Sequence, residues 1–231
     1  MRLPVALTSI HKWIGVVIGI QVVLWVAGGL VMSAFPIELV RGETQAAHPE
    51  PVAVTAQELR IDLREAIAAY GPVTGLRTLR IAGRLHVEAQ RAGAAPFLID
   101  AADGRRIDAI DEATAREVAT RDFTGEGRIV AATLLTEGPG EYRGALPVWQ
   151  VRFDDTRDTA IYVSAQNGQV AARRTDVWRL YDFFWMLHIM DYKERVDFNH
   201  ALLIGASALA LVLSATGFWL LFYRVRIRKG R

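Results

Sequence analysis

The stretch WIGVVIGIQVVLWVAGGLVMSAF, residues 13–35, contains 23 residues and no charged side chain. A second such stretch, ALLIGASALALVLSATGFWLLFY, covers residues 201–223. About 20 apolar residues, at a rise of ~1.5 Å each, cross a hydrocarbon layer ~30 Å thick. The alternative for the first stretch is a cleaved signal peptide, but the apolar core of a signal peptide is only ~7–15 residues long. The sequence therefore predicts two transmembrane helices, at 13–35 and 201–223.

The charges beside these two stretches predict their orientation. Residues 1–12 carry Arg2 and Lys12, and residues 224–231 carry five basic side chains. Because Lys and Arg concentrate on the cytoplasmic side of membranes, we expect both terminal segments to be cytoplasmic. Residues 36–200 would then lie outside, which is the periplasm in a bacterium with two membranes. The predicted location is the bacterial inner (cytoplasmic) membrane.

The overall charge divides into two unlike parts. The net charge is +2, and the two terminal segments together carry +7, so residues 36–200 carry −5. The basic pI therefore reflects membrane orientation, and we expect a lipid bilayer rather than nucleic acid as a partner. The absence of cysteine excludes disulfides, zinc-thiolate sites, iron–sulfur clusters and thiol catalysis.

The outer segment begins with a predicted linker and a first structural unit. Residues 36–54 contain prolines and show no clear periodicity, which predicts the linker. Thr55 and Glu58 form a capping-box pattern before apolar residues at helical spacing, so we expect a helix that starts at Thr55 and ends at Gly71-Pro72. Alternating apolar segments predict strands at 76–81, 84–89 and 97–100, and Asp103-Gly104 predicts a tight turn.

The same order of elements repeats 64 residues later. A short capped helix is expected over 111–121, and strands are expected at 128–135, 148–153 and 160–163. A shift of 64 residues also places Asp103-Gly104 on Asn167-Gly168. The predicted fold class is therefore membrane α+β, with two helix-plus-antiparallel-sheet units at 55–110 and 111–175 between the two spans.

This arrangement resembles the PepSY domain, a small α/β module of extracytoplasmic proteins. The resemblance rests on the first helix and on the strand–turn pairs 97–100 with 103–104 and 161–163 with 167–168. Three further segments are similar to PepSY-associated transmembrane helices: His11-Lys-Trp-Ile-Gly15, Leu187-His188 and Ala215-Thr216-Gly217. Together these segments cover most of the chain.

Some relatives with such helices are inner-membrane ferric reductases that carry haem on histidines of their spans. The resemblance thus implies His11 and His188, with His200 nearby, as candidate ligands of a b-type haem. His11 belongs to the cytoplasmic end of the first span, whereas His188 and His200 belong to the outer side. One iron cannot bridge ends ~30 Å apart, so one haem needs His188 with His200, or histidines from two chains. Alternatively, His11 and His200 are interfacial polar anchors.

Two other features suggest interfaces. Residues 176–200 form a dense aromatic segment, and Trp178, Trp185 and Tyr192 are typical of the headgroup layer. We expect a helix lying on the outer membrane surface, either as an anchor or as a docking surface or lid. Gly15 and Gly19 form a small-xxx-small pattern, which predicts close helix packing and leaves homo-oligomers or other membrane subunits as partners.

Taken together, these features lead to an expectation about the function of the protein. Hydrolase and phosphate-loop motifs are missing, so no catalytic residue is predicted, and acidic clusters such as 154–158 read as solvated turns rather than a metal site. The leading interpretation is an accessory or electron-transfer-associated subunit of a membrane iron-reductase or respiratory assembly, not an enzyme on its own. The alternative is a redox-inert, membrane-anchored module that binds or regulates a periplasmic protein.

Overall fold

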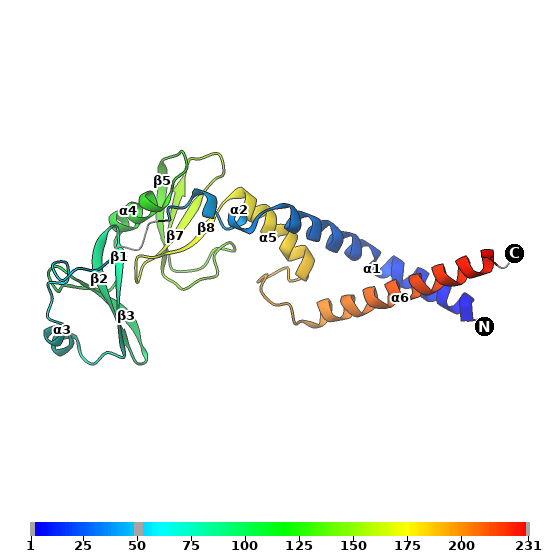
Figure 1. The fold of residues 1–231 in the computed structure, drawn as a ribbon, viewed down its shortest axis with the longest axis horizontal. Coiled ribbons are helices and arrows are strands. Elements are labelled where there is room, and N and C mark those ends of the chain that lie inside the picture. The colour runs from blue at the N-terminus through cyan, green and yellow to red at the C-terminus, as the bar shows by residue number, and fades with distance from the viewer. Residues whose placement is uncertain (1–2, 49–52, 230–231) are drawn as a thin grey trace. The chain divides into compact units, whose positions relative to one another are not determined.

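The computed structural model describes residues 3–48 and 53–229, which form two compact units. One unit comprises Met1–Pro36 and Leu180–Arg231, and we call it the membrane unit because it contains both predicted spans. The other comprises Ile37–Arg179, and we call it the outer unit after its predicted location. Figure 1 shows the order of their helices and strands along the chain. Arg2 and Arg231 of the predicted basic tails, and residues 49–52 of the predicted linker, lie outside the described residues.

The membrane unit contains two long helices, α1 (Leu3–Ala34) and α6 (Ala201–Lys229). The segments Val5–Ala34 and Ala201–Val225 are long and apolar enough to cross a membrane, and only 11% of each apolar window is buried. Helix α1 starts at Leu3, ten residues before the predicted start of the first span, so most of the predicted span lies within a longer helix. The added residues include the polar Thr8, Ser9, His11 and Lys12, none of which breaks a helix. The helix ends before Pro36, as expected for residues that precede a proline.

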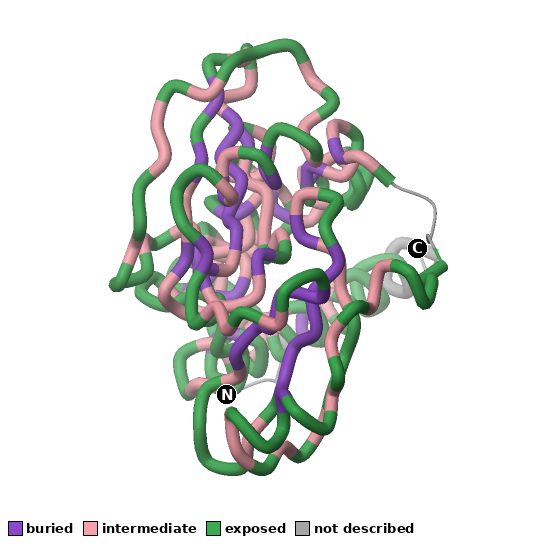
Figure 2. The backbone as a smooth tube through the Cα atoms, turned by 90° about the vertical axis from the view of Figure 1, so that its left-hand side faces the viewer, coloured by how far each residue is buried: buried purple, intermediate pink, exposed green. Residues whose placement is uncertain are grey.

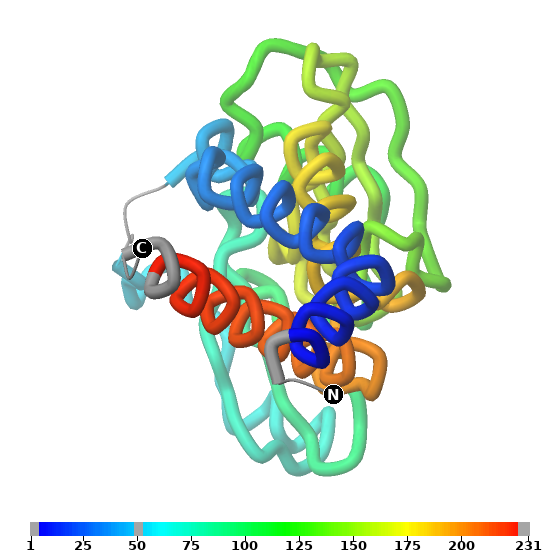
Figure 3. The backbone as a smooth tube through the Cα atoms, turned by 90° about the vertical axis from the view of Figure 1, so that its right-hand side faces the viewer, coloured from blue at the N-terminus to red at the C-terminus, as the bar shows by residue number. Residues whose placement is uncertain are grey.

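The two long helices run antiparallel and touch through small residues (Figure 3). A Cβ added to Gly15 would lie 3.6 Å from Leu213, and one added to Gly217 would lie 3.1 Å from the His11 ring. A third helix, α5 (Asp176–Ile189), covers the predicted aromatic segment up to Ile189 and contributes its later residues to this unit. The rest of that segment, up to His200, is a loop.

The outer unit contains two four-stranded antiparallel sheets, each with its strands in sequence order. The first half consists of α3 (Leu63–Tyr70), β1 (Gly75–Ile81), β2 (Arg84–Arg91), β3 (Ala94–Asp100) and β4 (Arg106–Ile107). The second half consists of α4 (Glu112–Asp122), β5 (Ile129–Leu135), β6 (Val148–Phe153), β7 (Ala160–Ser164) and β8 (Val170–Arg174). The predicted repeat of one helix with a small antiparallel sheet is therefore confirmed, and β4 and β8 complete each sheet after the repeated turn.

Both helices pack on sheets through small and branched residues. Ala66 of α3 covers a cluster that includes Val87 and Phe97. Ala115 and Ala119 of α4 cover a larger cluster that combines strands of the second sheet with Ile81 and Leu98 of the first. The two sheets of the outer unit therefore share this larger cluster, while the cluster under α3 stays separate, and buried residues gather on the strands in Figure 2.

Two details of the outer unit differ from the sequence predictions. The first helix begins at Leu63 rather than Thr55, because Asp62 caps it by accepting from the Arg64 N–H at 2.7 Å. The Thr55 N–H does donate a hydrogen bond to the Glu58 carboxylate at 3.1 Å, but this bond closes a turn and does not start a helix. The predicted linker holds the short helices α2 (Ile37–Val40) and η1 (Glu43–Gln45), and Ala46 pairs with Phe123.

Candidate functional site

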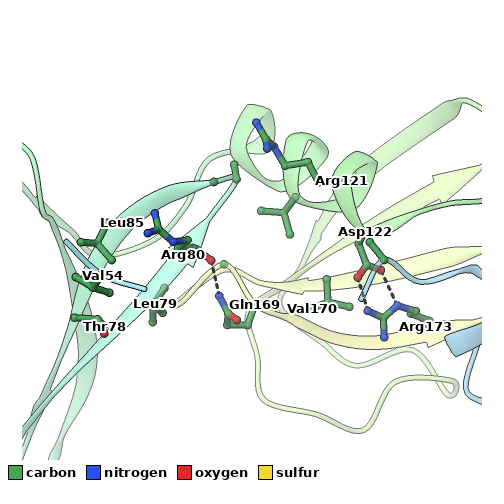
Figure 4. A pocket seen from close by; sticks show the side chains of 15 residues that line it. Val54, Thr78, Leu79, Arg80, Leu85, Arg121, Asp122, Gln169, Val170 and Arg173 are labelled. Carbon is green, nitrogen blue, oxygen red and sulfur yellow. Dashed lines mark hydrogen bonds and ion pairs between the residues drawn. The ribbon is translucent and has the colours of Figure 1, made fainter. Parts of the chain in front are cut away.

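A cleft of about 1000 Å³ opens in the outer unit between the two sheets (Figure 4). Strand β1 forms one wall, β8 and the turn before it form the other, and α4 borders both. The polar and charged side chains that line the cleft include Thr78, Arg80, Arg121, Asp122, Gln169 and Arg173. Both wall strands are edge strands within the described part of the chain, where β1 pairs only with β2 and β8 pairs only with β7. Such strands present backbone donors and acceptors on their unpaired side.

The hairpin between β1 and β2 determines which backbone groups of β1 face outward. Ala82 and Gly83 both have positive φ (49° and 81°), as in a two-residue type I′ turn closed by the pair Ile81 and Arg84. Because hydrogen-bonded pairs alternate along an antiparallel ladder, the backbone groups of Arg80 and Thr78 point away from β2. Consistent with this, the Gln169 side-chain amide donates to the Arg80 carbonyl at 3.2 Å (Figure 4).

The arginines of the cleft are paired with carboxylates. Arg80 donates to both oxygens of Glu58, at 2.8 and 3.1 Å, and these bonds lower the pKa of Glu58 to about 2. Arg173 binds Asp122 through two hydrogen bonds, and Arg121 binds Glu117 at 2.9 Å. The cleft wall is therefore close to neutral and does not form a concentrated anion site.

The turn at Asn167-Gly168 holds the two sheets together at the cleft. Gly168 has φ +65°, and an added Cβ would lie 2.7 Å from Ile81 of β1. Asn167 also donates to Glu88 of β2 at 3.4 Å. The repeated turn thus packs directly on the first sheet, and its glycine leaves the space that this close approach requires.

A second cluster, centred on Glu141, fixes the long loop between β5 and β6. Its carboxylate accepts from the Tyr162 hydroxyl at 2.5 Å and from Arg179 at 2.8 Å, while its carbonyl accepts from Arg174 at 2.7 Å. Burial raises the pKa of Glu141, but the bonds from Arg179 and Tyr162 outweigh it, so the pKa lies below its usual value. Burial and the bond to Glu141 raise the pKa of Tyr162. Tyr162 therefore stays protonated at neutral pH, and the cluster serves as a clamp rather than as a proton acceptor.

The sequence predictions did not include this cluster. Its members are 21 and 38 residues apart, and no local pattern connects them. Of the predicted interface residues, Trp178 lies under the guanidinium of Arg174, 4.2 Å from the ring centroid. Trp185 donates to the carbonyl of Arg195 at 3.0 Å, and Tyr192 is exposed. Gly15 contacts α6, whereas Gly19 has no neighbour within 4 Å, so association through this pair stays a prediction.

The three candidate histidines of the membrane unit have different surroundings. The Nδ1 of His11 is hydrogen-bonded to the Thr216 hydroxyl at 3.0 Å, and that hydroxyl also lies 2.8 Å from the Val212 carbonyl. His200 uses both ring nitrogens, since Nδ1 accepts from the Leu203 N–H and Nε2 donates to the carbonyl of Ile189 at 2.9 Å. The Nδ1 of His188 is buried without a hydrogen-bond partner, and a Cβ added to Gly28 would lie 3.6 Å from it.

These surroundings do not fit a haem held by two histidines of one chain. His188 packs at Gly28 of α1, 17 residues beyond His11, which is ~26 Å along the helix. The remaining histidine, His200, caps two helix ends with its two nitrogens. Only His188 offers a free ring nitrogen that is buried, so one chain supplies one candidate ligand rather than a pair.

Comparison with known proteins adds nothing to these observations. No family model, curated protein or solved structure matches the chain. The resemblance to the PepSY domain therefore stays a prediction. The interpretation of the cleft and of the Glu141 cluster rests only on their geometry.

Proposed function

We propose that the chain is a membrane-anchored binding module of the PepSY type. The two long helices anchor it in the cytoplasmic membrane, and the outer unit binds a partner protein outside the cytoplasm. The observation that carries this proposal is the cleft of about 1000 Å³ between the edge strands β1 and β8. Such a cleft lies at the upper end of the size range of small-molecule sites, and unpaired strand edges on both walls favour a larger ligand.

The residues of the cleft support binding rather than chemistry. The guanidinium groups of Arg80, Arg121 and Arg173 are each engaged by a carboxylate of the same chain. Apolar side chains, including Leu79 and Val170, supply surface that a partner would remove from water. Binding would therefore depend on shape, apolar contact and backbone hydrogen bonds, and only weakly on salt.

A photo-cross-linking amino acid at Thr78 tests this proposal in intact cells. Thr78 is exposed on β1 and lines the cleft. Thr133 is a matched control, because it is an exposed threonine on β5, the edge strand at the far side of the second sheet. We expect a discrete cross-linked product from position 78 and none from position 133. Equal products from both positions, or none from either, would contradict the proposal.

A second proposal is an accessory role in a membrane redox assembly, and one specific observation favours it. Among the described residues, the Nδ1 of His188 is buried in the membrane unit without a hydrogen-bond partner, and an unpaired buried nitrogen of this kind calls for a ligand or another group to complete it. If a haem were shared between subunits, it would supply electron transfer, and His188 would hold its iron. Purified complex from haem-replete cells should then show a b-type reduced-minus-oxidised spectrum that His188→Leu abolishes, with His48→Leu as control. A colourless complex would contradict haem binding at His188.

A further inference from the structure

The outer side of β1 carries backbone groups that face the cleft and that no described strand pairs with. The hairpin geometry directs the N–H and C=O groups of Thr78 and Arg80 away from β2. In the described part of the chain, no other strand pairs with this side of β1. Thr78 is exposed, so its outward groups are accessible from the cleft.

The side-chain amide of Gln169 already donates a hydrogen bond to one backbone carbonyl on this edge of β1. Gln169 reaches across the cleft and places its side-chain amide on the Arg80 carbonyl at 3.2 Å. A side-chain amide has the same donor and acceptor chemistry as a peptide group. This contact shows that the Arg80 carbonyl accepts a hydrogen bond from an amide across the cleft.

Arg80 also has an unused donor next to this edge. Its Nε is buried and has no hydrogen-bond partner among residues 3–48 and 53–229, although its two terminal nitrogens bind Glu58 and the Ala53 carbonyl. Buried donors without a partner are uncommon in folded proteins. Because the carboxylate of Glu58 already neutralises the guanidinium, a neutral acceptor such as a carbonyl oxygen suits this site better than a second anion.

We propose that the cleft binds an extended polypeptide that adds a strand to the free edge of β1. The backbone of the ligand would pair with Thr78 and Arg80, and its side chains would alternate between apolar contacts in the cleft and solvent. This inference rests on the proposed function and specifies its ligand class. It predicts recognition of backbone more than of a particular sequence.

The substitution that isolates backbone pairing is Thr78→Pro. Proline removes the outward N–H and obstructs an incoming strand, and it is tolerated on a strand edge because no bond to β2 is lost. Thr78→Ala keeps the N–H and serves as the matched control. Unchanged thermal unfolding of both variants would show that the fold is intact.

Peptides selected from a displayed dodecapeptide library against the full-length protein in lipid nanodiscs serve as the probe. We expect Thr78→Pro to weaken their binding by about tenfold or more and Thr78→Ala to weaken it little. N-methylation along the tightest peptide should abolish binding at every second residue, the signature of strand pairing. Equal affinity for both variants, uniform tolerance of N-methylation, or failure to select any peptide would overturn strand addition. A cross-linked product from position 78 in cells, found together with uniform tolerance of N-methylation in the peptides, would uphold partner binding and overturn strand addition, so the two proposals fail separately.

Discussion

Trp25 donates its indole N–H to the main-chain carbonyl of His188 at 2.7 Å, which joins α1 to the end of α5. Gln21 donates to the Leu187 carbonyl at 3.0 Å, and His200 donates to that of Ile189 at 2.9 Å. Carbonyls in the last turn of a helix lack partners within the helix. Side chains from α1 and from the start of α6 thus cap three consecutive carbonyls, which fixes the end of α5 within the membrane unit.

Replacing Trp25 by phenylalanine tests this cap. The change keeps an aromatic ring but removes the N–H, so the His188 carbonyl loses its partner. We expect the free energy of unfolding of the membrane unit to fall by about 1–3 kcal/mol, measured by denaturation in mixed micelles. Trp13→Phe is the control, because Trp13 is 64% exposed. Equal losses in the two variants would show that the bond is not what stabilises this contact.

The adjacent glycines Gly28 and Gly29 provide a matched pair for the packing of α5 on α1. A Cβ at Gly28 would lie 3.4 Å from the Phe184 carbonyl oxygen, whereas one at Gly29 meets nothing within 4 Å. Gly28→Leu should therefore lower the unfolding temperature in detergent. Gly29→Leu should leave it unchanged or raise it, since leucine favours a helix by about 0.5–1 kcal/mol over glycine. A similar response at both positions would argue against close packing at Gly28.

The glycine of the repeated turn can be tested in the same way. Gly168 and Gly93 both have positive φ, +65° and +67°, so alanine at either position is strained by about 1 kcal/mol or more. Only at Gly168 would the added Cβ overlap a neighbour, Ile81, across the junction of the two sheets. We expect Gly168→Ala to destabilise the outer unit by about 1–3 kcal/mol more than Gly93→Ala, measured by thermal unfolding. Equal effects would contradict the close contact.

Patterns along the chain were sufficient to predict much of this fold. The apolar runs indicated both long helices, and the 64-residue repeat indicated both sheets, because each depends on local periodicity. Strands β4 and β8 were missed, since Arg106–Ile107 is too short and Val170–Arg174 too polar to show alternation. They form because the preceding turns return the chain to the sheet edge.

The candidate sites were harder to predict, because contacts distant in sequence create them. The cleft depends on the packing of Gly168 against Ile81, and the clamp joins Glu141 to Tyr162 and Arg179. The expected helix start at Thr55 was wrong because a capping pattern can close a single turn without starting a helix. The expected role of the histidines came from resemblance, and the structure places the three in separate environments.

The Glu141 clamp predicts a dependence of stability on pH. Its pKa lies below the usual value of 4.5, so the folded state binds fewer protons than the unfolded state. The stabilisation is therefore complete above about pH 5 and is lost as the pH falls below 4.5. Glu141→Gln should reduce stability at pH 7 and flatten its decline between pH 5 and 3, measured by urea unfolding. Glu137→Gln, in the same loop, is the control, and an unchanged slope in Glu141→Gln would contradict the clamp.

The absence of cysteine makes the central claim, an outer unit anchored by two spans, directly testable by cysteine labelling. Gly140 is exposed in the outer unit with nothing within 4 Å, so Gly140→Cys should be neutral. In spheroplasts, a membrane-impermeant maleimide should label this cysteine at once. A cysteine added after Arg231 should be labelled only after the membrane is permeabilised. Labelling of the added C-terminal cysteine in intact spheroplasts, with Gly140→Cys protected, would contradict the account.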